Sequence, residues 1–172
     1  YQDSSDELWI GSWEYGLYHV DKDGVISNMR HDPLNPNSVS SNFVRGCCED
    51  NCGNIWIGTF NGLNRYHKSS GRFDNYVADN GTESLTHSSI WCIVKDAQGT
   101  LWLGTYFGGV NYFNPEYEIY TRYKATDMEK DGLSSPIIGR MTEDKDGNLW
   151  ICTEGGGVNV YNREEGTFRW YR

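Results

Sequence analysis

Short runs of alternating apolar and polar residues follow one another along the chain, and each run is bounded by Gly, Asp or Asn. Such alternation is typical of strands with one buried face. One phrase occurs four times, as "ELWIGSWEYGLYHV", "NIWIGTFNGLNRY", "TLWLGTYFGGVNYF" and "NLWICTEGGGVNVY". Its Trp residues are Trp9, Trp56, Trp102 and Trp150, which stand 47, 46 and 48 residues apart. A fixed period of this length predicts a repeat architecture in which these Trp residues are structural.

Each repeat contains four strand patterns. The first is "NFVRGCCED", "SIWCIVKD" or "PIIGRMTED", and it ends in an Asp-x-x-Gly turn: Asp50 to Gly53, Asp96 to Gly99, and Asp144 to Gly147. The Asp can cap such a turn and the Gly can take a positive φ, so we expect both to be structural. The Trp strand follows, then "LNRYH", "VNYFN" or "VNVYN", and last "RFDNYV", "EIYTRY" or "TFRWYR". Longer, Ser-rich connections at about 31–42, 78–88 and 124–136 lead to the next repeat.

A single meander of four short strands cannot bury both of its faces, whereas sheets stacked around an axis bury them against their neighbours. The pattern therefore predicts an all-β fold, a partial β-propeller over 1–172, although periodicity alone leaves a flat solenoid open. The expected blades are 7–30, 43–77, 89–123 and 137–172, and the first of them lacks its innermost strand. We expect an arc that belongs to a larger ring, or that self-associates through the apolar blade faces at its ends.

Composition narrows the range of partners. The net charge of −9 repels polyanions, so nucleic acid is not expected as a partner. No apolar run is long enough for a membrane segment, and the start "YQDSSDELW" has no leader, which is typical of a processed piece. The five Cys residues lack CxxC pairs, so we expect buried, unpaired thiols. Cys92 and Cys152 lie in apolar strand patterns, where a thiol acts as a small hydrophobe.

Candidate ligand-binding residues lie where the repeat varies. In a propeller, the turns after the Trp strand share one face with the connections between blades. These turns hold Trp13, Tyr15, Phe60, Asn61, Tyr106, Phe107 and Glu154. Aromatic rings stack on the apolar faces of sugars and polar neighbours bind hydroxyls, but the same rings could instead pack on adjacent blades.

The starts of the innermost strands also differ from blade to blade. Aligned positions there hold Arg45, Trp91 and Gly139, and the next position includes Arg140. The two arginines could bind an acidic sugar through charge-assisted bonds. Alternatively, they could form structural ion pairs with Glu49 or Glu143.

Catalytic and metal motifs are weak. The pairs Glu49-Asp50 and Glu143-Asp144 suggest glycosidase carboxylates, but both recur at the same turn of the repeat and are better explained as structural. "DKDGN" at 144–148 begins like a calcium loop but lacks its later Gly and Glu. The His residues lack metal spacing, "GGG" at 155–157 lacks the rest of a phosphate loop, and no Gly-x-Ser-x-Gly elbow occurs. We therefore expect no catalytic residue, metal or cofactor.

The repeat "ED(x)₂GNLWI(G/C)T(x)₂GG(V/L)N(x)Y" closely resembles the two-component regulator propeller repeats, found in the periplasmic sensor region of bacterial hybrid two-component systems. The resemblance covers Glu7 to Arg172. It implies a fragment of one of two seven-bladed propellers in an inner-membrane histidine kinase that senses oligosaccharides and controls transcription by phosphorelay. Cys152 departs from the pattern because it replaces the Gly of "WIGT", so we expect looser packing of that blade.

Two other functions stay open at this point. One is a glycosidase or polysaccharide lyase of propeller fold, which would depend on Glu154 or another loop carboxylate. The other is a protein-interaction scaffold that binds no saccharide.

Overall fold

Four antiparallel sheets contain the strands of the computed structural model, which describes residues 1–79, 81 and 83–172. The first sheet has three strands and the other three sheets have four each. In chain order the strands are β1 (Leu8–Gly11), β2 (Leu17–Val20), β3 (Ile26–Met29), β4 (Val44–Glu49), β5 (Ile55–Thr59), β6 (Gly62–His67), β7 (Arg72–Tyr76), β8 (Ile90–Lys95), β9 (Leu101–Thr105), β10 (Val110–Asn114), β11 (Ile119–Tyr123), β12 (Ile138–Glu143), β13 (Leu149–Thr153), β14 (Gly157–Asn162) and β15 (Thr167–Tyr171). A short 3₁₀ turn, Glu129–Asp131, lies in the last connection.

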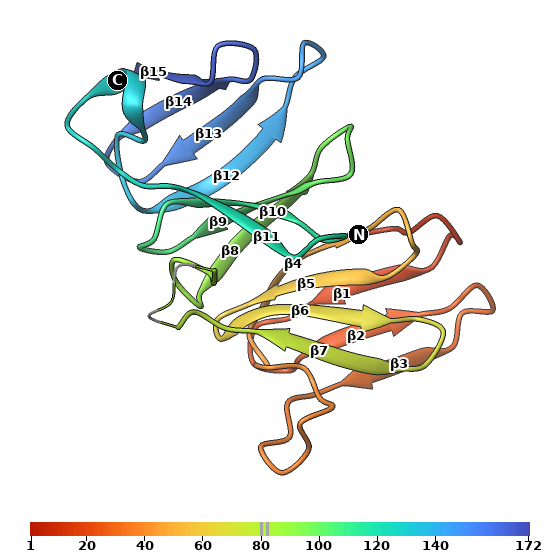
Figure 1. Ribbon diagram of the computed structural model, residues 1–172. Coiled ribbons are helices and arrows are strands. Elements are labelled where there is room, and N and C mark those ends of the chain that lie inside the picture. Colours follow the sequence, from red (N-terminus) through yellow and green to blue (C-terminus); the bar gives the residue numbers. More distant parts are fainter. Residues whose placement is uncertain (80, 82) are drawn as a thin grey trace.

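The sheets follow one another as the blades of a propeller arc. Each is a meander in which every strand pairs with its neighbour in sequence. Figure 1 shows the blades fanned from β1–β3 to β12–β15, with β8 between β4 and β12, and the view from behind shows the same order. The predicted all-β fold, with a first blade of three strands, is confirmed. Asn80 and Thr82, in the expected 78–88 connection, lie outside the described residues.

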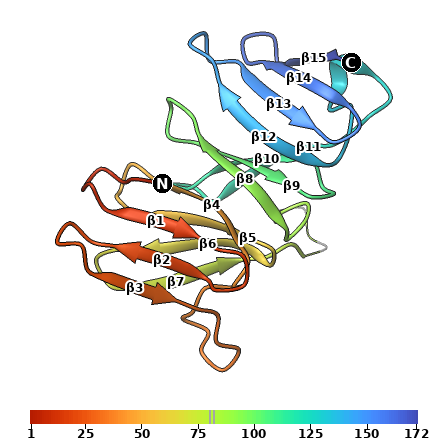
Figure 2. The ribbon, with the colours of Figure 1, turned by 180° about the vertical axis from the view of Figure 1, so that it is seen from behind.

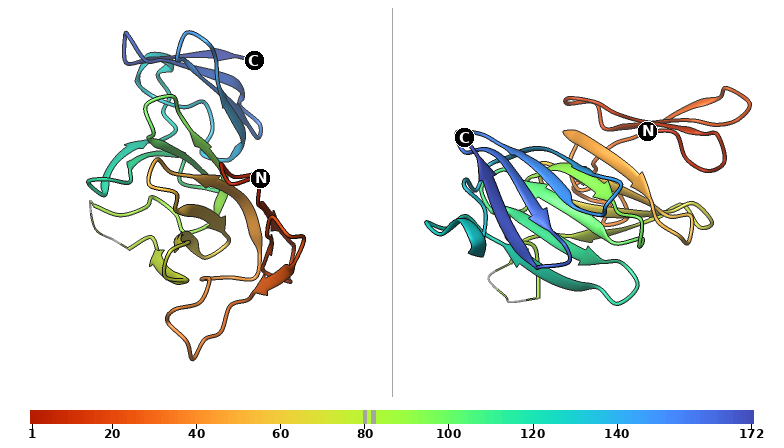
Figure 3. Two further views of the ribbon diagram at one scale, coloured as in Figure 1. Left: turned by 90° about the vertical axis from the view of Figure 1, so that its right-hand side faces the viewer. Right: turned by 90° about the horizontal axis from the view of Figure 1, so that it is seen from above.

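The C-terminus lies at the end of the arc formed by the last blade, whereas the N-terminus lies nearer the middle of the molecule (Figure 3). In the part of the chain that the structure describes, no helix is both long enough and apolar enough to cross a bilayer.

One hydrogen bond recurs in every blade. The indole Nε1 of the repeat Trp donates to the carboxylate of the Asp six residues earlier. The four bonds are Trp9 to Asp3 at 2.9 Å, Trp56 to Asp50 at 2.8 Å, Trp102 to Asp96 at 3.1 Å, and Trp150 to Asp144 at 2.8 Å. The other oxygen of each Asp accepts backbone N–H groups of the turn. The Asp therefore caps the turn and also satisfies the indole donor of the Trp.

Sequence reasoning missed this turn in the first blade. Asp3 lies six residues before Trp9, as in the other repeats, but Asp6 stands where they have Gly. Asp6 takes a φ of 64°, the left-handed conformation that Asp tolerates better than most residues. The spacing from Asp to Trp was the signal that could have identified the turn.

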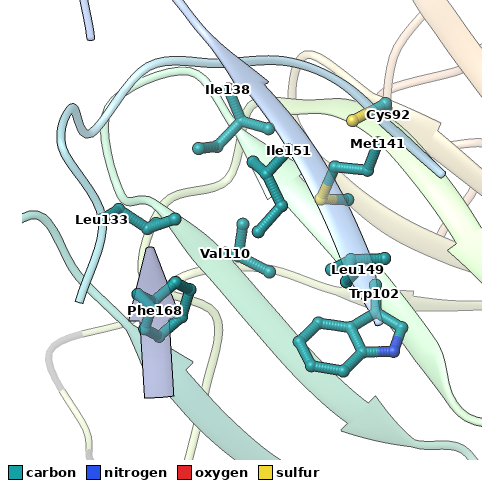
Figure 4. Close-up of a cluster of buried hydrophobic side chains, with 9 residues drawn as sticks. All are labelled: Cys92, Trp102, Val110, Leu133, Ile138, Met141, Leu149, Ile151 and Phe168. Carbon is teal, nitrogen blue, oxygen red and sulfur yellow. The ribbon is translucent and has the colours of Figure 1, made fainter. Parts of the chain in front are cut away.

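Blade packing explains the Gly of "WIGT". A Cβ on Gly58 would lie 2.7 Å from Ile90 Cγ2 of the next blade, and a Cβ on Gly104 would lie 2.6 Å from Ile138 Cγ2. The absence of a side chain thus lets the next innermost strand approach closely. Figure 4 shows one resulting core, in which Trp102 and Val110 of the third blade pack with Ile138 and Ile151 of the fourth.

The connections between blades are anchored by a buried Asn on the third strand of each full blade. The side-chain oxygens of Asn64, Asn111 and Asn159 accept the backbone N–H groups of Ser40, Thr86 and Ser134 at 2.7–3.0 Å. All three Asn residues are fully buried. These bonds fix the connections beside the turns that follow the Trp strands.

No described residue of the chain covers the outer face of the last blade. Trp150 is 39% exposed, whereas the other three repeat Trp residues are at most 1% exposed. A cavity beside Trp150 is lined also by Met141, Cys152 and Tyr171. Cys152 is therefore exposed, which explains how a side chain is accommodated at the Gly position.

The expectation of buried thiols is only partly correct. All five Cys residues are free, but only Cys48 and Cys92 are buried, while Cys52 and Cys152 are exposed and Cys47 is half-buried. Burial raises the pKa of the Cys92 thiol to about 12. Cys52 is exposed because it lies in the turn after β4, and Cys152 because no blade covers it.

We predict that Asp96→Ala destabilises the chain by about 3 kcal/mol, because it leaves a buried indole N–H and the Arg163 guanidinium without their carboxylate. Asp144→Ala is the matched control, since it removes the same cap and the same indole bond where Trp150 is exposed. Urea unfolding should show a clearly smaller loss for Asp144→Ala. If the two variants lose equal amounts of unfolding free energy, burial does not decide how much the bond between Trp and Asp stabilises the chain.

A second prediction concerns acid. Burial opposes ionisation of Asp3, but bonds donated by Lys68 and Trp9 lower the pKa of Asp3 from 3.8 to about 2. Because the folded pKa is depressed, the stabilisation is complete above the unfolded pKa and is lost as the pH falls from about 4 to about 2. Between about pH 4 and about pH 2, we expect the unfolding free energy of the unmodified chain to fall by about 2 kcal/mol more than that of Asp3→Asn, which has no carboxylate at this position. Urea unfolding at several pH values measures the difference, and parallel pH profiles would refute it.

Candidate ligand-binding surface

A β-bulge at the same repeat position opens each complete innermost strand. Val44 pairs with Thr59 and Gly46 with Gly58, so Arg45 is the extra residue. The same shift leaves Trp91 unpaired in β8 and Gly139 unpaired in β12. A bulge re-aims the extra side chain, and here it directs the Arg45 and Trp91 side chains to one group of aromatic rings.

These rings form a continuous surface across the first three blades. We call Trp13, Phe43, Arg45, Phe60, Trp91, Tyr106 and Phe107 the aromatic–arginine surface. Ring centroids lie 5.6 Å apart between Trp13 and Phe60, 5.8 Å between Phe60 and Trp91, and 5.2 Å between Trp91 and Tyr106. Trp13 and Phe107 are more than half exposed, and the other members are half-buried. The rings thus pack across blades, as one of the two expectations had it, and still present area to solvent.

Arg45 lies between two tryptophans at the centre of this surface. Its guanidinium carbon is 3.7 Å from the ring centroid of Trp91 and 4.6 Å from that of Trp13. Contacts of this kind stabilise a cation through the ring quadrupoles. Burial, together with the charge of nearby Arg140, lowers the pKa of Arg45. The rings hold the guanidinium in place without neutralising its charge.

The alternative ion pairs proposed for the arginines are wrong. Glu49 instead accepts hydrogen bonds from the backbone N and the Oγ of Ser4, at 2.7 and 2.8 Å. Glu143 contacts Arg163 at 3.4 Å. Within the described residues, neither Arg45 nor Arg140 takes part in an ion pair. Both carboxylates serve turns and blade contacts, which leaves the two arginines available to an anion.

The remaining candidates lie outside this surface. Tyr15 is exposed near Arg30, whose guanidinium carbon is 5.9 Å from the Tyr15 ring. Asn61 donates to Ser40 O at 3.4 Å, so it supports the connection between blades. Glu154 is exposed in the turn after β13. Sequence reasoning missed Phe43, which packs on Trp13 and Phe60 at 5.4 and 5.5 Å; its position just before the bulge was the available signal.

The seven residues of the aromatic–arginine surface are all aromatic apart from Arg45. Over the described residues, no group of three or more His, Cys, Asp or Glu side chains is arranged to hold a metal ion. The Asp144 carboxylate, at the start of "DKDGN", accepts bonds from Asp146, Asn148 and Trp150 within its own turn.

Sequence comparison identifies the repeat. Residues 38–61, 84–107 and 132–155 match the family described as "Two component regulator propeller". These three stretches carry the two-component regulator propeller repeat. Each matched stretch of these regulator propeller repeats runs from the connection between blades to the turn after the Trp strand. The bulge residues Arg45, Trp91 and Gly139 therefore all lie within the family repeat. No curated protein matches the chain in sequence.

Solved structures share the fold at low identity. An extracellular domain assigned to a hybrid two-component system of B. thetaiotaomicron is 18% identical with a TM-score of 0.65, over 99% of this chain and 27% of that chain. A catalytically inactive virginiamycin B lyase from Staphylococcus aureus, with quinupristin, is 17% identical with a TM-score of 0.71, over 100% and 54%. An auxiliary nutrient binding protein from Bacteroides ovatus is 12% identical with a TM-score of 0.63, over 96% and 38%. The chain thus spans only about a quarter to a half of these proteins.

We predict that Arg45→Met costs less than about 1 kcal/mol of unfolding free energy. Arg45→Met loses the contacts of the guanidinium with the two tryptophans. It also removes a partly desolvated charge and the repulsion between that charge and Arg140, and these gains offset the loss. Arg163→Met is the matched comparison, since Arg163 also lies over a Trp ring but pairs with buried Asp96. We expect it to cost about 3 kcal/mol, and urea unfolding gives the order. The reverse order would mean that the Arg45 charge is neutralised.

Proposed function

We propose that the chain is the ligand-recognising part of a periplasmic, non-catalytic sensor propeller of a hybrid two-component histidine kinase, and that its ligand is an oligosaccharide. The family repeats support the regulator role. The observation that carries the ligand class is the aromatic–arginine surface. There the rings of Trp13, Phe60 and Trp91, from three consecutive blades, surround Arg45, which forms no ion pair among the described residues.

The chemistry of this surface fits a saccharide. Flat rings such as Trp13 and Phe107 offer apolar area to the C–H faces of pyranose rings, while the Arg45 guanidinium donates hydrogen bonds to hydroxyl or carboxylate oxygens. Arg140 is not part of the surface, but its charge acts on Arg45, and its guanidinium can donate in the same way. The rings extend over several blades, so they match an extended ligand of a few sugar units better than a compact metabolite. Tyr15, Asn61 and Glu154 lie on turns of the same kind and could extend the contact.

Binding across blades would also give the signal a physical origin. A ligand that touches three blades favours one relative arrangement of them, and it shifts a signalling equilibrium only if its affinity differs between the two states. The proposal therefore places the signal in the geometry of the arc, which the rest of a receptor would read.

We also propose that a further blade covers the exposed face of the last sheet. This blade belongs either to the same protein or to a second copy of it. The inner interfaces support this, since there each equivalent face is covered by the next innermost strand. Cys152 occupies the space that Gly58 and Gly104 leave for Ile90 and Ile138. We expect the covering strand to carry a smaller residue at that position.

Isothermal titration of neutral and acidic oligosaccharides tests the proposal. Trp91→Ala and Arg45→Met should each weaken binding about tenfold or more, since each removes a central contact of the surface. Trp150→Ala is the matched control, because Trp150 is an exposed tryptophan outside the surface. Binding by no saccharide, or equal weakening by Trp150→Ala, would contradict the proposal and point to a protein partner.

A further inference from the structure

Two of the three blade interfaces contain the same buried ion pair. Lys68 Nζ lies 2.7 Å from Asp3 Oδ2 of the first blade, and Arg163 Nη2 lies 3.0 Å from Asp96 Oδ2 of the third blade. Both cations stand at the start of the turn that follows the third strand, after His67 and Asn162 respectively. In each case a side chain of one blade reaches the fully buried carboxylate that caps the Trp turn of the blade before it.

The middle interface lacks this cation. Pro115 holds the corresponding position, after Asn114, and has no charge to offer. Among the residues that the structure describes, no Lys, Arg or His lies within ion-pair distance of Asp50. Asp50 Oδ2 accepts instead from Trp56 Nε1 at 2.8 Å and from Asn54 Nδ2 at 3.0 Å.

A pocket of about 240 Å³ opens between the blades at this point. Its lining comes from the Trp turns of the second and third blades and from the turn at Pro115, and it consists of Asp50, Asn51, Cys52, Asn54, Arg65, Gln98, Gly99, Thr100, Asn114, Pro115 and Glu116. These side chains supply amide donors and acceptors beside two carboxylates. The pocket lies at the opposite end of β4 and β5 from the aromatic–arginine surface, so it is a separate site.

The charge of the pocket is negative on balance. Among the described lining residues only Arg65 is basic, and its Nη2 is already bound to Asp74 at 2.9 Å and to Glu118 at 3.2 Å. Lys95, which is not a lining residue, lies 3.5 Å through its Nζ from Asn51 Oδ1. The Asp50 oxygens already accept four hydrogen bonds within their own turn, but the negative charge of Asp50 and the exposed carboxylate of Glu116 have no cation bound to them among the described residues. A polar pocket with uncompensated carboxylates favours a cation that can also donate hydrogen bonds.

We propose that this pocket binds a small molecule carrying a guanidinium or ammonium group, which takes the place that Lys68 and Arg163 hold at the other two interfaces. The ligand cation contacts Asp50 and Glu116, and the amides around it bind its remaining polar groups. The site goes beyond saccharide recognition, since it uses neither the aromatic rings nor Arg45. Its occupant holds the second and third blades together as the ion pairs hold the other blades.

Methylguanidine is the probe, and the rate of Cys52 alkylation by iodoacetamide is the readout, because Cys52 is exposed and lines the pocket. Peptide mass spectrometry separates Cys52 from the other exposed cysteine, Cys152. We expect saturating methylguanidine to slow Cys52 alkylation about fivefold or more, and neutral methylurea to have no effect. An unchanged rate with methylguanidine, or equal slowing with methylurea, overturns the proposal.

Variants place the effect at the pocket. Pro115→Arg supplies the missing cation from the chain, so Cys52 should become slower to alkylate and insensitive to methylguanidine. Glu116→Gln, an exposed change that spares the fold, should weaken the methylguanidine effect about tenfold. If methylguanidine slows Cys52 alkylation in both variants as much as in the unmodified chain, the cation does not bind in this pocket and the proposal is overturned.

The reciprocal change supplies the positive control. Arg163→Ala removes the natural cation beside Asp96, and methylguanidine should restore part of the lost thermal stability. If methylguanidine rescues Arg163→Ala yet leaves Cys52 of the unmodified chain unaffected, a cation fits the turn of the repeat but not the pocket at Asp50, and the proposal fails.

Discussion

The hydrogen bond from the repeat Trp to the Asp six residues earlier is the constraint on which the arc depends. The large indole provides the apolar area that a thin sheet needs, but its N–H must find an acceptor once it is buried. The Asp that caps the turn supplies that acceptor, so one side chain fixes both the hairpin and the orientation of the ring. The ring then packs on an aromatic residue of the next blade, as Trp56 does on Phe113 at 5.2 Å. Local turn chemistry is in this way joined to packing between blades.

This arrangement leaves other positions of the repeat free to vary. The bulge at the start of each innermost strand holds Arg45, Trp91 or Gly139 while the pairing around it stays the same. A Cβ on Gly139 would meet only Cys152 O at 3.5 Å, so glycine is not sterically required there. The scaffold can therefore carry different binding groups on each blade without any change in its core.

The sequence predicted most of the fold because every blade repeats one pattern of strands, turns and large residues. It missed the turn at Asp3 because Asp6 replaces the expected Gly. It missed Phe43 because the pattern assigns that residue to an innermost strand and does not show that its ring packs on Trp13 and Phe60. The remaining errors concern contacts between blades. A repeat alignment shows what each blade contains but not which side chain of the neighbour faces it.

Glu49 and Cys152 are two residues whose surroundings could not be predicted from the repeat alignment. Glu49 binds Ser4, a residue that the first blade brings from 45 positions away, so the nearer Arg45 stays free of it. Cys152 is exposed because no described residue covers the outer face of the last sheet, although the sequence of its strand is typical of a buried one. The candidate site could be predicted from the sequence as a set of turn residues. Its centre could not, because Arg45 lies between tryptophans of two other blades, and their position depends on how the blades pack.

The claim that the aromatic–arginine surface recognises an oligosaccharide is tested most directly by nuclear magnetic resonance. The indole N–H signals of the seven tryptophans are followed while an oligosaccharide that binds the chain is titrated in. If the aromatic–arginine surface recognises the ligand, the signals of Trp13 and Trp91 shift with saturation. The four indoles bonded to Asp should stay in place, since their donors are already occupied. Shifts confined to Trp150 or Trp170, with Trp13 and Trp91 unmoved, would contradict the claim that the aromatic–arginine surface recognises the ligand.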